Sequence, residues 1–405
     1  MRIDEVLMKR CIDKAWEYQT LTLPNPAVAA MVYDDNGEIL SLEAHQKAGL
    51  PHAEVLAVFW AFVQIYAQSK QKNLHYQKVD SSLESTFATS HTTPPQALGE
   101  LETLAPLWQD FQATHTEFSH IALEALPLHS HAIHAFIAAY HNGAFYDKTI
   151  LLTLEPCNHF GKTPPCAQLI AQIAPKRVLI AARDIWGESA NGSKRLQEAG
   201  VAVEFITNTS LKKQAQNVLY PFLCLRESRR FVVFKLAERL DGSYKNGQIS
   251  GDLSRIFTHN QRTIAQSLII SGATARADRP RLDTRYATPP YANTSVPDVG
   301  IFTRKNRKDI DSNIPLFHID SRSVCIYDDK TLQELPNGFH IIEGSLQLFS
   351  HIYPLLKSPL LLLVHLSPTI AQAPQALCQS IARDISCEIL HTTTLGKDLL
   401  LWLKP

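Results

Sequence analysis

The pattern of apolar and polar residues in the first half of the chain predicts alternating helices and strands. An N-terminal helix is expected, with a buried side made of Ile3, Val6, Leu7, Ile12 and Ala15. Short apolar runs predict strands at residues 27–33, 149–154, 177–181 and 201–206, and another at 38–42 after the turn Asp35-Asn36-Gly37. Helices are expected from Ala53 onward and at 166–173 and 193–199. This alternation predicts an α/β domain with a mainly parallel sheet between helical layers.

A second unit of the same class is expected in the last part of the chain. Apolar runs predict strands at 231–236 and 267–270. The segment between them predicts a helix that ends near residue 266, with Ser250 or Asp252 as its N-cap. We therefore expect two α/β domains, with the boundary near residue 225.

An insertion of about residues 67–144 interrupts the first unit. It contains a low-complexity stretch at 81–95, which predicts a flexible loop. Two helical patterns follow at 96–113 and 121–140, the second interrupted at Pro127. Loop insertions are tolerated thermodynamically, so the parts on either side can still come together. An oligomer contact and a lid are both open as the purpose of the insertion.

Composition narrows the class of protein. The 405 residues suffice for two or three domains, and 39 basic residues balance 39 acidic ones, which disfavours nucleic acid as a partner. Seven scattered cysteines, an odd number, do not suggest a disulfide framework. The N-terminus lacks the apolar core of a signal peptide, and apolar stretches such as 360–364 are too short to span a bilayer. We expect a soluble, cytoplasmic enzyme with no membrane partner.

One histidine and two cysteines carry the strongest chemical signal. His52 and Glu54 lie at the start of a predicted helix, Cys157 follows a predicted strand, and Cys166 opens another helix. A strand end and a helix N-terminus can bring the two thiols together, where the helix dipole favours thiolate. One imidazole and two thiolates make a three-ligand Zn²⁺ set, which leaves the fourth position for a water as in catalytic sites. Glu54 can then carry protons without binding the metal, as in zinc deaminases.

A second group of histidines lies in the insertion, which holds eight of the 17 in the chain. Three of them, His129, His131 and His134, suggest a metal site. No cysteine joins them, and their spacing is poor for shared ligation from one helix. A solvated or packing role is therefore favoured.

The segments around the zinc ligands resemble those of a known family, the riboflavin-biosynthesis deaminase–reductase. The resemblance rests on Asn25-Pro26-Ala27-Val28, on residues 45–55 and on residues 154–166. In the last segment, eight residues separate Cys157 from Cys166, whereas cytidine and tRNA adenosine deaminases usually have two. Residues 1–64 and 146–285 resemble the family well, and the rest resembles it weakly.

The resemblance implies a fold and a function. Residues 1–225 would form an N-terminal cytidine-deaminase-like three-layer α/β/α domain with a helical insertion, and residues 226–405 a C-terminal dihydrofolate-reductase-like α/β domain. The implied reactions are zinc-dependent hydrolytic deamination of 2,5-diamino-6-(5-phosphoribosylamino)pyrimidin-4(3H)-one and NADPH-dependent reduction of the ribosyl group to ribityl. Zn²⁺ and NADPH are the implied cofactors, a small phosphoribosyl pyrimidine is the partner, and a homo-oligomer is expected.

The resemblance also assigns roles to residues. In the deaminase half, Glu54 would be catalytic, and the substrate contacts would be Asn25, His45, His159, Lys162 and Asp184. In the reductase half, the cofactor contacts would be Ala237, Thr274, Asp278 and Ser345. The substrate contacts there would be Arg262, Leu282, Arg285 and Glu343. Residues 398–403 resemble the closing strand of the family.

Some positions depart from the family pattern. Ile185 follows Asp184 where the family has proline, Arg239 replaces a serine, Phe257 replaces a helix aspartate, and Ser345 replaces a glycine. Two alternatives to the bifunctional enzyme therefore stay open. One is a deaminase whose inactive C-terminal domain serves oligomerisation, which NADPH binding would distinguish. The other is a non-enzymatic, zinc-stabilised binding protein, which would have no need of Glu54.

Overall fold

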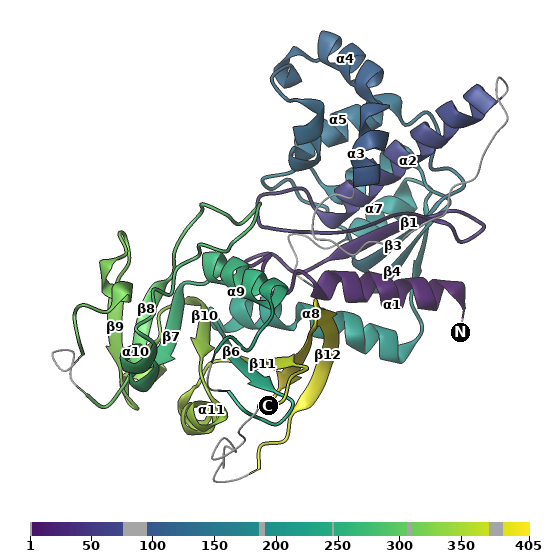
Figure 1. Cartoon of the computed structure of the whole chain (residues 1–405). Coiled ribbons are helices and arrows are strands. Elements are labelled where there is room, and N and C mark those ends of the chain that lie inside the picture. Colours follow the sequence, from purple (N-terminus) through teal and green to yellow (C-terminus); the bar gives the residue numbers. More distant parts are fainter. Residues whose placement is uncertain (1, 76–94, 186–190, 245–246, 306–309, 372–383) are drawn as a thin grey trace. The chain divides into compact units, whose positions relative to one another are not determined.

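The computed structural model describes residues 2–75, 95–185, 191–244, 247–305, 310–371 and 384–405. Contacts along the chain divide it into two compact units (Figure 1). The first unit contains Met1–Tyr18 and Ala27–Val218, and the second contains Gln19–Pro26 and Leu219–Pro405. The short segment Gln19–Pro26 therefore belongs to the second unit, although both of its chain neighbours belong to the first. The predicted flexible loop at 81–95 lies outside the described residues, apart from its last position.

The first unit contains a five-stranded sheet in the order β2-β1-β3-β4-β5. Its strands are β1 (Ala29–Tyr33), β2 (Ile39–Ala44), β3 (Thr149–Leu154), β4 (Arg177–Ala182) and β5 (Ala202–Phe205). β3, β4 and β5 are parallel, but β1 is antiparallel to both β2 and β3. The expectation of a mainly parallel sheet was therefore wrong for one half. A short turn joins β1 to β2, and two strands joined in this way must run antiparallel.

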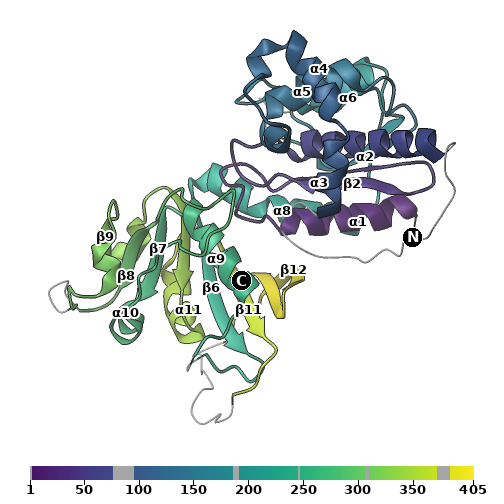
Figure 2. The same ribbon diagram turned by 45° about the horizontal axis from the view of Figure 1, so that its top comes forward.

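Helices lie on both faces of this sheet, as expected (Figure 2). One face is covered by α1 (Ile3–Trp16), and α2 (Ala53–His75) and α6 (Cys166–Ile173) lie on the other. The remaining helices near the sheet are α7 (Gly192–Glu198) and α8 (Thr209–Ser228), which continues into the second unit.

The buried side of α1 differs from the prediction. Leu7, Ile12 and Ala15 are buried as expected, but Ile3 is 54% and Val6 is 45% exposed. The buried stripe also holds Met8, Cys11 and Trp16. At about 100° per residue, Val6 points nearly opposite to Ala15, so the two side chains cannot face the sheet together.

The insertion is helical, with more breaks than its pattern predicted. It forms α3 (Pro95–Glu102), α4 (Ala105–Thr114), α5 (Ser130–Tyr140) and the 3₁₀ helices η1 (Thr116–Phe118) and η2 (Leu123–Leu128). The segment around Pro127 is a 3₁₀ turn, because proline lacks the N–H that an α-helix interior requires. The insertion packs on α2 through aromatic side chains, with Phe136 lying 6.0 Å from Phe62 between ring centroids.

The second unit contains an eight-stranded sheet in the order β12-β13-β11-β6-β10-β7-β8-β9. Its strands are β6 (Arg230–Arg239), β7 (Ser267–Ser271), β8 (Asp298–Phe302), β9 (Val324–Tyr327), β10 (Gly338–Glu343), β11 (Leu360–Ser367), β12 (Glu388–Leu395) and β13 (Asp398–Lys404). The six strands from β11 to β9 are parallel, and β13 is antiparallel to both of its neighbours. The expected strands at 231–236, 267–270 and 398–403 are thus confirmed.

The two faces of this sheet differ in chemistry. One face is an apolar core that includes Val232, Phe234 and Leu362 and the helix α11 (Leu346–Ile352). The other face is covered by α9 (Asp252–Ile264), whose Phe257 packs against Trp402 of β13. The N-cap of α9 is Gly251, which corrects the expected Ser250 or Asp252, and its N–H donates to Asp398 Oδ2 at 2.6 Å. The other helices are α10 (Gly272–Asp278) and the 3₁₀ turns Pro315–His318, Thr331–Glu334 and Tyr353–Leu355.

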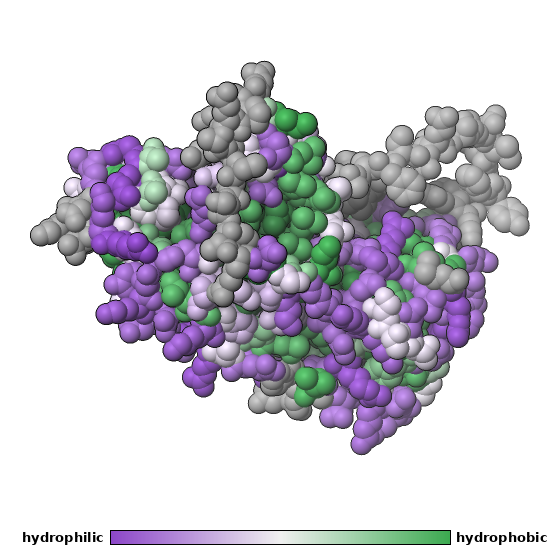
Figure 3. Space-filling model, turned by 90° about the horizontal axis from the view of Figure 1, so that it is seen from below, coloured by the Kyte–Doolittle hydropathy of each residue, from purple (hydrophilic) through white to green (hydrophobic). Residues whose placement is uncertain are grey.

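Within the described ranges, no helix combines the length and the apolar character that crossing a bilayer requires. The face of the molecule in Figure 3 is mainly hydrophilic, with smaller hydrophobic areas between the polar ones.

Candidate functional site

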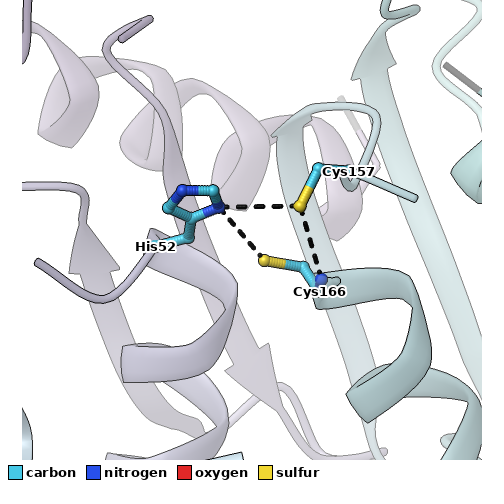
Figure 4. Close-up of side chains that lie close together, drawn as sticks. All are labelled: His52, Cys157 and Cys166. Atoms are coloured by element: carbon cyan, nitrogen blue, oxygen red, sulfur yellow. Dashed lines mark hydrogen bonds between the residues drawn. The ribbon is translucent and has the colours of Figure 1, made fainter. Parts of the chain in front are cut away.

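His52, Cys157 and Cys166 point toward one another in the first unit (Figure 4). Nδ1 of His52 lies 3.7 Å from Sγ of Cys157 and 3.4 Å from Sγ of Cys166. Zn–S bonds of about 2.3 Å and Zn–N bonds of about 2.05 Å at tetrahedral angles place sulfur and nitrogen about 3.6 Å apart. The spacing therefore fits Zn²⁺. In the part of the chain that the structure describes, no other group of three His, Cys, Asp or Glu residues comes this close together.

Local structure explains how the cysteines meet. Cys157 follows β3, and Cys166 is the first residue of α6. The backbone N–H of Cys166 donates to Cys157 Sγ at 3.4 Å, and the N–H of Ala167 donates to the carbonyl oxygen of Cys157 at 3.1 Å. The N–H groups of a helix N-terminus have no partner inside the helix, so they are well suited to bind a thiolate.

The electrostatics of the three groups favour a bound cation. The Cys166 thiol donates to Cys157, and this contact, together with His52, lowers the pKa of Cys157 to about 4 despite its burial. The same contact raises the pKa of Cys166, because the first thiolate holds the remaining proton. Burial alone would lower the pKa of His52, but the Cys157 thiolate and the charge of Glu54 raise it. Thiolates and an imidazole are ligands that Zn²⁺ prefers.

Glu54 lies in the first turn of α2 and is only 5% exposed. Burial raises the pKa of Glu54 to about 7, although the charge of His52 lowers it. Its carboxyl group interacts with the thiol of Cys166. The structure therefore places an acid–base group beside the candidate metal centre, two residues after a ligand.

The histidine expected to contact the substrate base lies next to the metal ligands. The ring centroid of His45 is 5.2 Å from that of His52. Burial lowers the pKa of His45 to about 3, so its ring is neutral, and Nδ1 lies 3.0 Å from the carbonyl oxygen of Pro51. Nδ1 therefore carries the proton and donates to this carbonyl, which makes Nε2 an acceptor.

The other residues expected to contact the substrate in the deaminase half lie on three different segments of the chain. Asn25 lies in the segment Gln19–Pro26, where its N–H donates to Thr22 O at 2.9 Å. His159 and Lys162 are exposed on the loop between the two cysteine ligands. Asp184 follows β4, and its N–H donates to Glu155 Oε2 at 3.1 Å.

Sequence reasoning missed Glu155, a buried carboxylate two residues before Cys157. Its Oε1 accepts from the N–H of Ser193 at 3.0 Å and from the hydroxyl of the same residue at 2.5 Å. Gly192 lies so close to this turn that a Cβ would stand 1.8 Å from Pro156 O. These contacts lock the segment before Cys157 onto α7. The signal in the sequence was a charged residue directly after an apolar strand.

A polar pocket lies directly after the first cysteine ligand. It is lined by Asn158, Asn191, Lys194, Arg195 and Glu198, and an Arg195 guanidinium nitrogen donates to Asn158 Oδ1 at 3.1 Å. Both cationic residues come from α7, which only the fold brings beside Asn158. Sequence reasoning therefore had no means of finding this pocket.

Three of the four expected cofactor positions lie on neighbouring strands, or just after them, in the second unit. Ala237 lies in β6, Thr274 in the helix that follows β7, and Ser345 directly after β10. Ser345 caps α11 by accepting from the N–H of Leu348 at 3.4 Å, so the serine in place of the family glycine has a structural use. The fourth, Asp278, is exposed at the end of α10. Ligands of open α/β sheets bind at the carboxyl ends of their strands.

The expected substrate contacts of the reductase half pair with other groups of the protein. Arg262 binds both carboxylate oxygens of Glu343 at 3.0 Å. Burial would raise the pKa of Glu343, but Arg262 and Lys235 hold it below its usual range. Arg285 binds Asp283 at 2.8 Å, and Leu282 is buried. Phe257, at the position of the family aspartate, packs against Trp402.

The insertion histidines occupy different environments. His129 and His131 are exposed, whereas His134 is 7% exposed in α5. Burial lowers the pKa of His134 to about 4, and the Cys157 thiolate acts in the opposite direction. His134 is therefore close enough to Cys157 to interact with it electrostatically.

No model of a protein family matches this chain. Among curated proteins, the riboflavin biosynthesis protein RibD of Bacillus amyloliquefaciens is 35% identical over 146 residues, 34% of this chain and 38% of the relative. RibD of Aquifex aeolicus is 25% identical over 290 residues, 70% of this chain and 58% of the relative. The chain thus spans about two fifths of the first of these relatives and under two thirds of the second.

Solved structures match over the full length. A deaminase/reductase of Thermotoga maritima matches with a TM-score of 0.54 and 20% identity over 100% of this chain and 99% of the other. RibD of Acinetobacter baumannii matches with a TM-score of 0.53 and 19% identity over the same shares.

The fold and the candidate metal site together define the class: two α/β units with the fold of a solved deaminase/reductase, the first of which holds a His, Cys, Cys set. The expected fold class is confirmed by the full-length match. The resemblance to the riboflavin-biosynthesis deaminase–reductases, RibD, is confirmed by both kinds of comparison.

Proposed function

We propose that this chain is a bifunctional enzyme of riboflavin biosynthesis. It deaminates 2,5-diamino-6-(5-phosphoribosylamino)pyrimidin-4(3H)-one hydrolytically and then reduces the ribosyl group of the product with NADPH. The observation that carries the proposal is the His52, Cys157 and Cys166 set beside buried Glu54, within a fold shared over its full length with a deaminase/reductase.

His52, Cys157 and Cys166 are the proposed zinc ligands, and Glu54 is the proposed catalytic residue. When bound, Zn²⁺ supplies a water that ionises near neutral pH. Glu54 would take a proton from the attacking water and pass it to the exocyclic nitrogen of the pyrimidine. The new C–O bond forms, the C–N bond breaks, and ammonia leaves. Burial keeps Glu54 away from bulk water during this transfer.

The remaining contacts of the deaminase half follow from the chemistry of the substrate. We assign Asn25 and His45 to the pyrimidine, and neutral His45 can accept a hydrogen bond from it at Nε2. We assign His159, Lys162 and Asp184 to the ribose phosphate. Lys162 is exposed on the loop between the cysteine ligands, where a cation can meet a phosphate from solvent.

The second unit is the proposed reductase. Ala237, Thr274, Asp278 and Ser345 would contact NADPH, three of them within or after neighbouring strands. The proposed substrate contacts are Arg262, Leu282, Arg285 and Glu343. Since Arg262 and Glu343 already bind each other, the pair would act as one preformed polar group, which lowers the entropic cost of binding.

The proposal extends to the organisation of the protein. The deaminase function is assigned to residues 1–225, with the insertion at about 67–144, and the reductase function to residues 226–405. Among the described residues, no disulfide joins any of the cysteines, which supports a reducing, cytoplasmic environment; these are Cys11, Cys157, Cys166, Cys224, Cys325 and Cys387. A homo-oligomer that acts only on small molecules is part of the same proposal.

The test is to incubate zinc-loaded protein with the diamino substrate, with and without NADPH, and to follow products by mass spectrometry. We expect the deaminated ribosyl compound in both cases and the ribityl compound only with NADPH. A deaminated product that NADPH does not change would overturn the reductase assignment and favour a C-terminal domain used for oligomerisation. Absence of any deaminated product would overturn the deaminase assignment.

A further inference from the structure

A row of ionisable side chains crosses the sheet of the second unit beneath α9. Asp398, His365, Lys235 and Glu343 lie on β13, β11, β6 and β10, which are consecutive strands of the sheet. Neighbours in the sequence of each strand, such as Val364, Leu236 and Ile342, point into the apolar core. Because side chains alternate along a strand, the four ionisable groups share the opposite face.

The register sets the order within this row. Lys235 pairs with Glu343, whereas His365 pairs with Ala237, two residues further along β6. The row therefore runs obliquely from Glu343 toward the carboxyl ends of the strands, past the proposed cofactor position Ala237. The N-terminus of α9 closes the far end, where the Gly251 N–H donates to Asp398.

The half of this row nearest the N-terminus of α9 is unusually poor in hydrogen bonds. His365, Asp398 and Ser254 of α9 are all fully buried. Neither ring nitrogen of His365 has a hydrogen-bond partner among the described residues, and the same is true of Asp398 Oδ1 and Ser254 Oγ. Buried polar atoms are nearly always paired, so four such atoms gathered under one helix indicate a function other than packing.

Lys235 interacts electrostatically with the other charged groups of the row. Burial lowers the pKa of Lys235, as does Arg262, whereas Glu343 and Asp398 act in the opposite direction. Burial and the charge of Lys235 keep the pKa of His365 far below its usual value, so the imidazole is neutral and offers one donor and one acceptor. His365 thus stands between a cation on β6 and a carboxylate on β13.

Another buried histidine of the same sheet provides a contrast. His340 of β10 is also fully buried, but its Nδ1 lies 2.8 Å from the Ser267 hydroxyl and its Nε2 lies 2.8 Å from Pro336 O. His340 therefore has the pairing of a structural histidine. Neither ring nitrogen of His365 has such a hydrogen bond within the described ranges.

We propose that His365 is a positioning residue of the reductase site, which acts with Asp398 and Ser254 through ordered water to fix the ammonium group of Lys235. This inference rests on the proposed function. Lys235 lies opposite the proposed substrate contact Glu343 in the register of β6 and β10, so the position of its ammonium group sets the charge beside that carboxylate.

The test uses full-length, zinc-loaded protein with His365→Phe, His365→Gln and, as the matched control, His340→Phe. We expect His365→Phe to lower kcat for formation of the ribityl compound by about 10- to 100-fold, the range of a lost positioning contact. The KM for the ribosyl compound and the Kd for NADPH should stay within about threefold, since binding groups are unchanged. His365→Gln keeps a donor and an acceptor and should recover part of kcat.

Stability separates positioning from packing. We expect His365→Phe to leave the midpoint of thermal unfolding unchanged, because neither ring nitrogen of His365 bonds directly to another described residue. His340→Phe should lower the midpoint, since it breaks two hydrogen bonds. Should His365→Phe fail to fold, His365→Gln carries the kinetic test alone.

Three results would overturn the inference. The first is a ribityl rate in His365→Phe, or in His365→Gln where only that variant folds, within threefold of the wild type. The second is a loss of thermal stability in His365→Phe equal to that in His340→Phe. The third is that the wild type itself forms no ribityl product. This result overturns the proposed reductase function as well, and the wild-type sample alone reveals it. Deaminase activity, measured in every variant, should stay constant.

Discussion

Glu54 is the residue on which the deaminase proposal depends most directly. It is buried beside Cys166, yet its carboxyl group does not belong to the set of His52, Cys157 and Cys166 whose spacing fits a zinc ion. A second acidic residue, Glu43 of β2, also has its pKa raised to about 7 by burial, but its charged neighbours are Lys14 and Glu17 of the N-terminal segment. The two carboxyl groups thus share a shifted pKa and differ in their relation to the metal centre.

This difference predicts the behaviour of Glu54→Gln. The variant should lose deaminase turnover by at least about 10²- to 10⁴-fold, because the amide cannot carry a proton. Zinc content and the midpoint of unfolding should be those of the wild type. The matched variant Glu43→Gln should keep its activity. A fall in bound zinc, measured by metal analysis of Glu54→Gln, would contradict its assignment as a proton carrier.

Gly192 is a second residue whose identity the fold requires. A Cβ at this position would stand 1.8 Å from Pro156 O, directly before the ligand Cys157. Gly192→Ala should therefore lower the free energy of unfolding by about 2–4 kcal/mol, through a forced backbone shift. It should also weaken zinc binding, because the shift reaches the turn that holds Cys157.

Gly99 provides the control for this change. It lies in α3, and nothing stands within 4 Å of an added Cβ. Gly99→Ala should be neutral or should raise the free energy of unfolding by up to about 1 kcal/mol, since alanine favours helix. Chemical denaturation of both variants measures the difference. Equal effects would mean that Pro156 moves aside without cost.

At the scale of elements, α1 is tied to the sheet by a polar cluster at its first turn. Asp4 accepts hydrogen bonds from Arg177 of β4 at 2.8 and 3.1 Å and from the hydroxyl of Tyr33 of β1 at 2.6 Å. Burial alone would raise the pKa of Asp4, but these hydrogen bonds and the charge of Arg177 lower it. One carboxylate therefore connects three elements of the first unit.

The pKa shift fixes the pH dependence of this connection. A carboxyl group whose pKa is lower in the folded state stabilises the fold at pH values above its unfolded pKa, which is about 3.9 for Asp. The stabilisation is lost as the pH falls through the folded pKa. At pH 7, the free energy of unfolding of the wild type should exceed that of Asp4→Asn by about 1–2 kcal/mol. Urea denaturation at pH 7 and at pH 3 should show that this difference is smaller at pH 3. An unchanged difference would contradict the assigned direction of the pKa shift.

At the scale of the whole molecule, the two units carry separate sheets and separate candidate sites. The proposed zinc ligands all belong to the first unit, and the row from Asp398 to Glu343 belongs to the second. The two proposed reactions should therefore respond independently to loss of the metal.

Metal removal tests this independence. Treatment with a strong zinc chelator should abolish deamination of the diamino substrate, because hydroxide is no longer generated at neutral pH. Reduction of the deaminated ribosyl compound, supplied directly together with NADPH, should continue at about the untreated rate. Restored zinc should restore deamination. Loss of both reactions at the same chelator concentration would show that the reductase unit needs the metal-bound first unit to stay folded.

Local sequence determined the elements and the candidate metal ligands. β3 and α6 agree with their predicted bounds because each is a short apolar run or stripe closed by polar residues or proline. Cys157 and Cys166 lie where those bounds place them, at a strand end and a helix start. His52 and Glu54 likewise follow from the start of α2. The full-length structural match confirms the fold class that these elements suggested.

Only the tertiary structure decided how distant residues meet. The antiparallel position of β1, the pairing of Arg262 with Glu343, and the placement of Glu155 on α7 depend on strand order and on helices that are far away in the sequence. The same holds for His365, which in the sequence is one histidine in an apolar strand. Periodicity reports which face of its own element a side chain occupies, whereas the partner on that face is chosen by packing between elements.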